Sequence, residues 1–332
     1  MKKTLFFVLS VFLFAILFSN CKPEDPVNEA QVLAEYLESV NSPLKKDYVN
    51  TDLPSIMPAS EVKTLNETGQ VYIIDIRSAT DFATGHILNA HNVAVADVLT
   101  HIKAVDLTPY TKVAVVCYTG QTAGFVVSVL RLMGYEKAFS MKWGMCSWHS
   151  DFAAKWKNTI AAGNTYASQF VATATDKGAI GELPTLTTEK TTGQEILEAR
   201  VNAVLAEGFT PASINNKAVF DNLANYYIVN YWPADQYADP GHIPGAIQYT
   251  PKESLKLATS LKTLPKDKTI VVYCYSGQTS AFLVAYLRIL GYDAKSLLFG
   301  TNGMIYDLMK AKPTMSASTF TDNVIMGYDY VQ

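Results

Sequence analysis

The chain has 332 residues, of which 49% are hydrophobic and 17% are charged, and its formal net charge is −3. This length predicts two domains that can each bury a core, and the composition is typical of globular protein. The negative charge and the lack of a basic run argue against nucleic-acid binding. Four cysteines and five histidines lie scattered without metal-ligand spacing, so we predict no metal site.

The first 21 residues are typical of an export signal. Two lysines precede an apolar run over residues 4–18 that is too short to span a membrane comfortably. Residues 17–21 resemble a bacterial lipobox with Cys21 as the lipidation site; the alternative is an ordinary signal cleaved near Cys21. We therefore predict a lipid anchor to a membrane of the bacterial cell envelope, on the periplasmic or outer-membrane side. Residues 22–58 would form a tether and an N-terminal helix.

Residues 59–157 are predicted to form the first α/β domain. Apolar residues at helical spacing predict an amphipathic helix over about residues 28–45 before it. The elements predicted inside it are a helix over 60–65, a strand over 71–74 that ends at Asp75, a strand over 92–95, a helix over 99–105 and a strand over 138–141.

The central unit of this domain places a cysteine at the end of a strand. The β-branched run 112–116 predicts a buried parallel strand that ends at Cys117. A polar loop over 118–122 leads into a helix whose apolar residues recur at helical spacing until Gly134. The cysteine is therefore expected to face the N-terminus of this helix.

The second half of the chain repeats this unit. The strand is 269–273, Cys274 ends it, and the loop that follows differs from the first only by Ser276 in place of Thr119. An opening helix and an upstream strand recur as well, which predicts a duplicated domain over residues 192–312 rather than a solenoid.

Two further segments complete the predicted organisation. Residues 158–191 are rich in Ala, Thr, Gly and Asn and read as a linker, of which residues 166–171 are expected to pack back on the first domain. Residues 313–332 are predicted to be an irregular C-terminal extension.

The position of each cysteine predicts a reactive thiol. Unpaired N–H groups and the dipole at a helix start favour negative charge, so the thiol should lose its proton easily and be a good nucleophile. The cradled group could also be an anion on the sulfur, such as a persulfide. Gly120 and Gly277 are expected to let the backbone amides face inward. The alternative is a buried, inert cysteine, which the repetition of the whole loop disfavours.

Further motifs precede the loops. The first half contains Asp75-Ile-Arg77 and an acidic-aromatic stretch, 81–87, that includes His86. The second half has a similar stretch, 236–246, that includes His242, but reads Asn-Tyr-Trp over 230–232 where the first has Asp-Ile-Arg. Together with the two loops, these motifs resemble a tandem of rhodanese-like sulfurtransferase domains. The resemblance implies an α/β fold of two such domains, each with a central, mainly parallel sheet flanked by helices.

The resemblance also implies sulfur transfer through a cysteine persulfide, with Cys117 and Cys274 as catalytic residues and no cofactor. The implied donor of sulfane sulfur is thiosulfate, a polysulfide or a persulfide, and the acceptor is a thiol, which a protein could carry, or cyanide. The implied cradle of the persulfide consists of Tyr118, Thr119, Gly120, Gln121, Thr122, Tyr275, Ser276, Gly277, Gln278 and Thr279.

Four residues outside the loops are expected to support the two sites. Asp75 and Arg77 should pin neighbouring loops by hydrogen bonds and an ion pair. His86 is expected to bond to backbone in a turn rather than act as a base, and His242 is its counterpart. Because neither loop carries Arg or Lys, a dianionic donor should be held poorly, and the loop tyrosines would suit a less charged donor or a protein partner.

Two other classes of function were weighed against sulfur transfer. Phosphatase chemistry on a related fold needs Cys-x5-Arg, and the arginine position holds Ala123 in one loop and Ser280 in the other. The runner-up is a non-catalytic rhodanese-like module that binds a partner or carries sulfur at the cell envelope. The altered Asp-x-Arg position of the second copy favours it, and the intact cysteines of both loops oppose it.

Overall fold

The computed structural model describes residues 28–332. The predicted export signal and the predicted lipidation at Cys21 lie outside these residues and stay predictions. In the part that is described, no helix is both long enough and apolar enough to cross a membrane.

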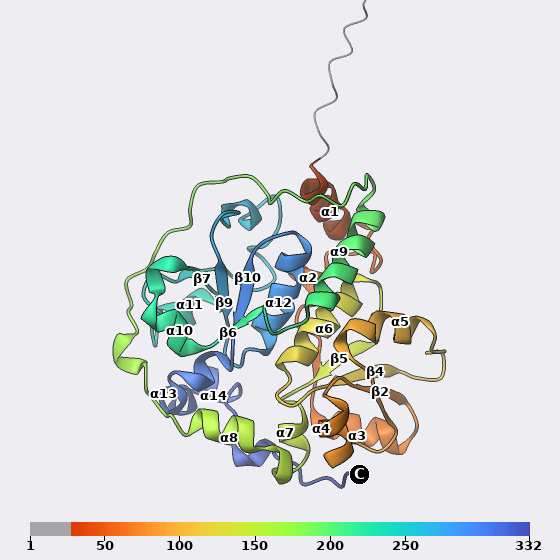
Figure 1. The fold of residues 1–332 in the computed structure, drawn as a ribbon. Helices are drawn as coiled ribbons and strands as arrows, with labels where there is room; N and C mark the ends of the chain where they lie inside the picture. The colour runs from red at the N-terminus through yellow and green to blue at the C-terminus, as the bar shows by residue number, and fades with distance from the viewer. Residues whose placement is uncertain (1–27) are drawn as a thin grey trace, which may run out of the picture.

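Each half of the chain forms a five-stranded parallel sheet (Figure 1). The first has the order β1-β5-β4-β2-β3, and its strands are β1 (Ile56–Met57), β2 (Val71–Asp75), β3 (Ala90–Asn92), β4 (Lys112–Val116) and β5 (Ala138–Met141). The second has the order β6-β10-β9-β7-β8, and its strands are β6 (Ser213–Ile214), β7 (Tyr227–Asn230), β8 (Ile247–Gln248), β9 (Ile270–Tyr273) and β10 (Ala294–Leu297). The two sheets have the same topology, which confirms the predicted α/β fold with two parallel sheets flanked by helices.

The helices follow the same duplication. Those of the first half are α1 (Glu29–Glu38), α2 (Tyr48–Thr51), α3 (Ala59–Glu67), α4 (Ala79–Thr84), α5 (Val98–Lys103), α6 (Gln121–Leu132), α7 (Met145–Trp148) and α8 (Ala154–Ile160). Those of the second half are α9 (Gly193–Glu207), α10 (Asn216–Asp221), α11 (Ala234–Ala238), α12 (Gln278–Ile289), α13 (Tyr306–Ala311) and α14 (Pro313–Ser316).

The opening helix is shorter than the predicted range of 28–45. Helix α1 ends at Glu38, and the backbone N–H of Ser39 closes the last turn on the carbonyl of Tyr36. Pro43 lies a few residues on, and a proline disfavours helical conformation in the residue before it and lacks the N–H that a helix needs. The strand predicted over 92–95 is likewise displaced, since β3 ends at Asn92.

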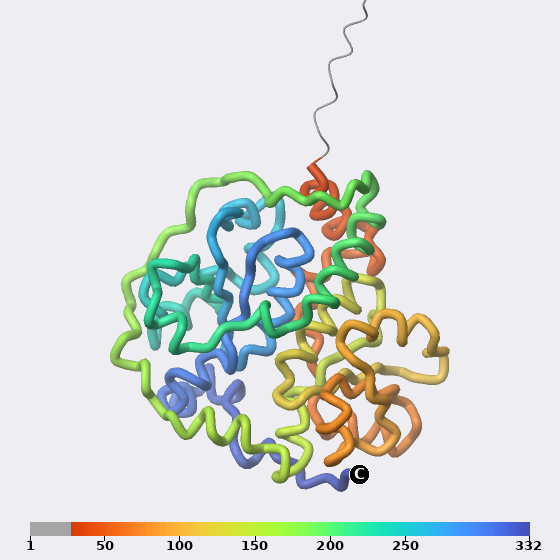
Figure 2. The backbone as a smooth tube through the Cα atoms, in the orientation of Figure 1, coloured from red at the N-terminus to blue at the C-terminus, as the bar shows by residue number. Residues whose placement is uncertain are grey.

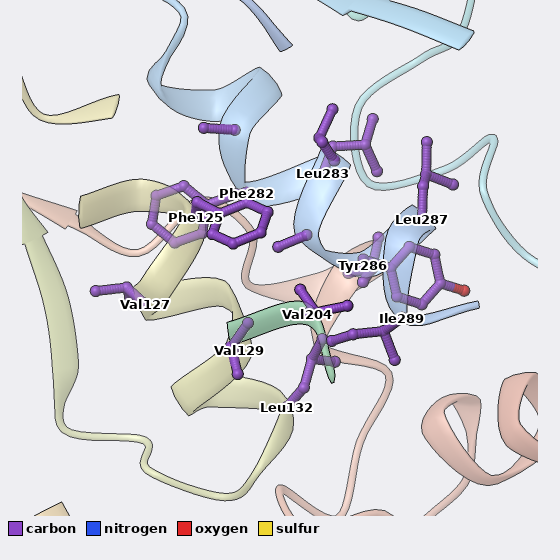
Figure 3. Packing of buried hydrophobic residues seen from close by; sticks show 14 of the residues in the cluster. Phe125, Val127, Val129, Leu132, Val204, Phe282, Leu283, Tyr286, Leu287 and Ile289 are labelled. Atoms are coloured by element: carbon purple, nitrogen blue, oxygen red, sulfur yellow. The ribbon is translucent and has the colours of Figure 1, made fainter. Parts of the chain in front are cut away.

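The two halves share one core, and helices α6 and α12 form its centre. Side chains from both helices, with Val204 of α9, gather there (Figure 3). The Ser128 hydroxyl of α6 donates a 2.8 Å hydrogen bond to the Phe282 carbonyl of α12. A Cβ atom at Gly124 would lie 3.0 Å from the Gln278 carbonyl oxygen, so the close approach of the helices depends on this glycine. Because each cysteine loop directly precedes one of these helices, the contact between the helices places the two loops near the boundary between the halves.

Segments that follow each half cross over to the other half (Figure 2). Val171, after the first half, pairs with His242 of the second through two backbone hydrogen bonds of 2.9 Å. Val331, near the C-terminus, pairs in the same way with His86 of the first. The expectation that residues 166–171 pack back on the first domain is therefore wrong. The backbone edge at His86, which would be their equivalent position, is occupied by the C-terminal segment.

Candidate active site

Cys117 lies directly after β4 and faces the start of α6, as the strand–loop–helix pattern predicts. Its Sγ accepts hydrogen bonds from the backbone N–H groups of Gly120 (3.1 Å) and Ala123 (3.3 Å). Gly120 adopts a left-handed conformation (φ +85°), and a Cβ atom there would clash with the side-chain amide of Gln278. The loop therefore needs glycine both for its turn and for the close approach of the other half.

Burial raises the pKa of the Cys117 thiol above its ordinary value, because the thiolate would lose its hydration. Hydrogen bonds from the backbone N–H groups of Ala123, Thr119 and Gly120 lower this pKa, and the Asp75 carboxylate raises it, so the amides offset the burial only in part. The expectation of an unusually acidic thiol at rest is therefore wrong. The sequence pattern indicated the helix N-terminus but not that the side chain would be only 5% exposed.

Asp75 and Arg77 form a buried ion pair beside this cysteine. The Arg77 Nη2 atom lies 2.6 Å from Asp75 Oδ2, and Arg77 Nε lies 3.0 Å from Oδ1. Nη2 also donates to the carbonyl oxygen of Gly85 at 2.7 Å, which ties the end of β2 to the turn after α4. Among residues 28–332, the buried Nη1 of Arg77 has no hydrogen-bond partner. The guanidinium lies 5.2 Å from the ring centroid of Tyr118 and 5.5 Å from that of Phe152.

A pocket of about 280 Å³ opens at Cys117 and is lined by both halves of the chain. The first half contributes charged and polar groups, among them Arg77, Asp81 and Lys155. The second half contributes an apolar wall of Phe209, Leu298 and Phe299. Lys155 lies over the ring of Tyr118, 4.1 Å from its centroid, and the Tyr118 hydroxyl donates to Asp81 at 3.1 Å.

Lys155 and the apolar wall did not emerge from the sequence. Lys155 belongs to α8, well after the cysteine loop, and no motif marks it. The wall residues belong to the other half and reach Cys117 only because α6 and α12 pack together. A duplicated sequence indicates that two domains exist, but it does not indicate which surfaces face each other.

Gln121 and Gln278, which are predicted to belong to the persulfide cradle, have side chains that connect the two halves. The Gln121 Oε1 atom accepts a 2.8 Å hydrogen bond from the backbone N–H of Phe299, and Gln278 Oε1 accepts a 3.0 Å bond from that of Trp143. Phe299 and Trp143 are equivalent residues, and both have a positive φ (62° and 64°), which is rare for bulky residues. Each glutamine therefore ties its own cysteine loop to the turn that follows the last strand of the other half, β10 for Gln121 and β5 for Gln278.

The other loop residues have mixed surroundings. Thr119 and Thr122 line the Cys117 pocket, and the carbonyl oxygen of Thr119 accepts a 3.2 Å hydrogen bond from the Trp156 indole. In the second loop, Ser276 Oγ accepts from the N–H of Gln278 at 3.4 Å, and Thr279 is half-buried.

The second loop has the same backbone form but different neighbours. Gly277 is again left-handed (φ +77°), and Cys274 accepts a 3.3 Å hydrogen bond from the N–H of Ser280, yet its side chain is only 1% exposed. Trp232 stands where the first half has Arg77 and stacks on Tyr275, with ring centroids 5.0 Å apart. Tyr275 also donates to Gln236, which replaces Asp81. The second site therefore lacks the cation and the two acids of the first.

His86 and His242 are turn residues whose rings bond to backbone. The Nδ1 atom of His86 lies 3.0 Å from the carbonyl oxygen of Phe82. Both ring nitrogens of His242 lie 3.0 Å from carbonyl oxygens, those of Tyr237 and Thr173. Neither histidine is among the residues that line the Cys117 pocket.

Cys146 is fully buried and does not face the pocket. Its thiol donates a 3.0 Å hydrogen bond to the Phe152 carbonyl oxygen, and burial raises its pKa to about 12. It packs in an apolar cluster with Trp143, Trp156 and Phe320. Across residues 28–332, no group of three or more His, Cys, Asp or Glu side chains could hold a metal ion.

Comparisons with known proteins show what the chain is similar to. The rhodanese-like domain model matches residues 58–151 and 217–304, together more than half of the chain. Thiosulfate sulfurtransferase GlpE of Pseudomonas fluorescens is 29% identical over 109 residues, which cover 33% of this chain and 94% of that protein. GlpE of Pseudomonas aeruginosa is 30% identical over 94 residues, which cover 28% and 83%.

Solved structures span both halves of the chain. SseA from Escherichia coli, described as a 3-mercaptopyruvate sulfotransferase, is 17% identical, with a TM-score of 0.27, and the match covers 75% of this chain and 98% of that one. Thiosulfate sulfurtransferase from Pseudomonas aeruginosa is 16% identical, with a TM-score of 0.26, and the match covers 84% and 68%.

Proposed function

The chain belongs to the rhodanese-like domain family, and from this we propose that it is a sulfurtransferase that carries sulfane sulfur as a persulfide on Cys117. The donor is thiosulfate, a polysulfide or a persulfide, and the acceptor is a thiol or cyanide. One observation carries the proposal. Cys117 Sγ accepts two backbone hydrogen bonds at a helix start and lies at a pocket that contains Arg77 and Lys155.

The reaction has two half-reactions. Cys117 attacks the outer sulfur of the donor, a new S–S bond forms, and the donor's own bond to that sulfur breaks with its electron pair on the leaving group. Because burial raises the pKa of this thiol, its proton is lost to water before the thiolate attacks. The acceptor then attacks the outer sulfur of the persulfide and releases Cys117. The N–H groups of Gly120 and Ala123 stabilise the negative charge on sulfur in both steps.

The second domain is proposed to complete the first site rather than to form an equal one. Its Phe209, Leu298 and Phe299 line the Cys117 pocket. Its own Cys274 is buried, and the Arg77 position holds Trp232, which stacks on Tyr275, instead of a cation. These observations favour the non-catalytic alternative for this domain alone.

The proposal is tested by intact mass after incubation with thiosulfate and, separately, with polysulfide, in a Cys21→Ser background. We expect a gain of about 32 Da, for one added sulfur, that cyanide or a reductant removes. The gain should disappear in Cys117→Ser and persist in Cys274→Ser. If no donor adds mass to any variant, the chain is not a sulfurtransferase and the binding module becomes the better account.

The raised pKa of Cys117 predicts how its reactivity depends on pH. Below the pKa the thiolate fraction rises about tenfold per pH unit, so the alkylation rate by iodoacetamide should climb steadily from pH 6 to 9 without a plateau. Peptide mapping of the alkylated protein measures this rate for Cys117 separately from the other thiols. A plateau below pH 7 would instead show a depressed pKa and contradict the geometry.

A further inference from the structure

We propose that the Cys117 site selects a sulfur donor with a single negative charge and an apolar organic group, of the organic thiosulfonate class, over inorganic thiosulfate. This inference rests on the proposed function and specifies its donor. In this proposal the negatively charged end of the donor lies toward Lys155, and its organic group lies against Phe209, Leu298 and Phe299 of the second domain.

The charges at the pocket disfavour a dianion. Asp75 compensates Arg77 in a buried bidentate pair, and Asp81 lines the pocket together with Lys155, so the four formal charges cancel. In the described part of the chain, Lys155 has no carboxylate within ion-pair distance. The exposed Lys155 ammonium can bind one negative charge, but a second one would meet no further free cation, because Arg77 is paired with Asp75 and almost fully inaccessible.

The apolar wall is held rigidly in place. Phe299 is fixed by the hydrogen bond from its N–H to Gln121 and by an edge-to-face contact with Trp156, with ring centroids 4.9 Å apart. Phe209 packs on Phe125 of α6 at a centroid distance of 5.5 Å. A pocket of about 280 Å³ is larger than an inorganic anion needs. A donor with an organic group can bury apolar surface against the preformed wall and gains binding free energy from that burial.

The chemical step balances without an added oxidant or reductant. The Cys117 thiolate attacks the outer sulfur of R–SO₂–S⁻, a Cys117 S–S bond forms, and the S–S bond of the donor breaks. The electron pair of that bond leaves on the sulfinate, R–SO₂⁻, and the enzyme keeps the persulfide, so two negative charges are present before and after. Cyanide then removes the outer sulfur as thiocyanate and regenerates the thiolate.

An assay of thiocyanate formation with three donors distinguishes the effect of donor charge from the effect of apolar contact. The donors are thiosulfate, methanethiosulfonate and benzenethiosulfonate. The two thiosulfonates have the same charged group and differ only in the organic group. In a ping-pong scheme, kcat/KM for the donor reports its half-reaction alone. We expect benzenethiosulfonate to exceed methanethiosulfonate by about 10-fold or more, and methanethiosulfonate to exceed thiosulfate.

Phe209→Ala should lower the ratio of benzenethiosulfonate to methanethiosulfonate by about 5-fold, with thiosulfate changed by less than about 2-fold. Phe220→Ala, a matched loss of a phenyl ring on α10, should leave all three donors unchanged. The thermal midpoint is measured for each variant, and Phe209→Leu replaces Phe209→Ala if the latter unfolds.

The donor inference is overturned if thiosulfate is the best donor of the wild type, if the two thiosulfonates react equally, or if the Phe209 variant slows all donors by one factor. These outcomes leave the proposed function standing. By contrast, the failure of every donor to yield thiocyanate or a persulfide would remove both.

Discussion

Replacement of Cys117 by serine is expected to abolish sulfur transfer to cyanide, with a loss of kcat/KM on the order of 10⁴-fold or more, as for removal of a covalent nucleophile in other enzymes. A serine hydroxyl fits the space of the thiol and can accept the same hydrogen bonds from Gly120 and Ala123, so the fold should persist. It cannot, however, form a persulfide. The measurement is the rate of thiocyanate formation with the best donor found.

Two matched serine variants serve as controls for this result. Cys274→Ser and Cys146→Ser make the same chemical change at buried thiols that do not line the Cys117 pocket. Both should keep activity within about 3-fold of the wild type, provided that the fold is intact. Substantial activity in Cys117→Ser, together with its loss in Cys274→Ser, would move the working site to the second domain.

Replacement of Asp75 by alanine is expected to lower the free energy of unfolding by about 3–5 kcal/mol, because it leaves the buried Arg77 guanidinium without its carboxylate. Both side chains are almost fully inaccessible to solvent, and the pair has two-point geometry. Urea denaturation measures the loss. Salt should change it little, since a buried pair is screened far less than a surface pair.

The control is Glu67→Ala, which removes the exposed partner of Lys63 on α3 and should cost less than about 1 kcal/mol. The double variant Asp75→Ala/Arg77→Leu removes both charges and should recover part of the stability lost in the single variant. A loss for Asp75→Ala no larger than that for Glu67→Ala would show that the pair is hydrated in solution, contrary to its burial here.

The asymmetry of the two sites follows from a few substitutions. In the first site the Arg77 guanidinium lies beside the ring of Tyr118, whereas in the second Trp232 takes its place and stacks on Tyr275. Gln236 in place of Asp81 removes an acid. The sequence showed the first of these changes as a departure from Asp-x-Arg. The structure shows its consequence: the loop keeps its backbone form, but its tyrosine stacks on Trp232 instead of lying beside an arginine.

The sequence by itself determined the local units of this protein. Hydrophobic pattern and glycine positions act over a few residues, so they indicated two strand–loop–helix repeats, the cysteine at each strand end and the parallel α/β fold. Asp75 and Arg77 lie two residues apart at a strand end, so their ion pair could also be predicted from the local sequence.

Only the tertiary structure decided how the two repeats combine. The packing of α6 on α12 gives the Cys117 pocket its wall from the second domain and makes Gln121 and Gln278 links between the halves. In addition, Val171 and Val331 each pair with the domain other than the one that they follow. The folded chain also buries the Cys117 thiol, and desolvation then outweighs the hydrogen bonds from the loop amides in setting its pKa. These outcomes depend on contacts between residues far apart in the chain, which no local pattern encodes.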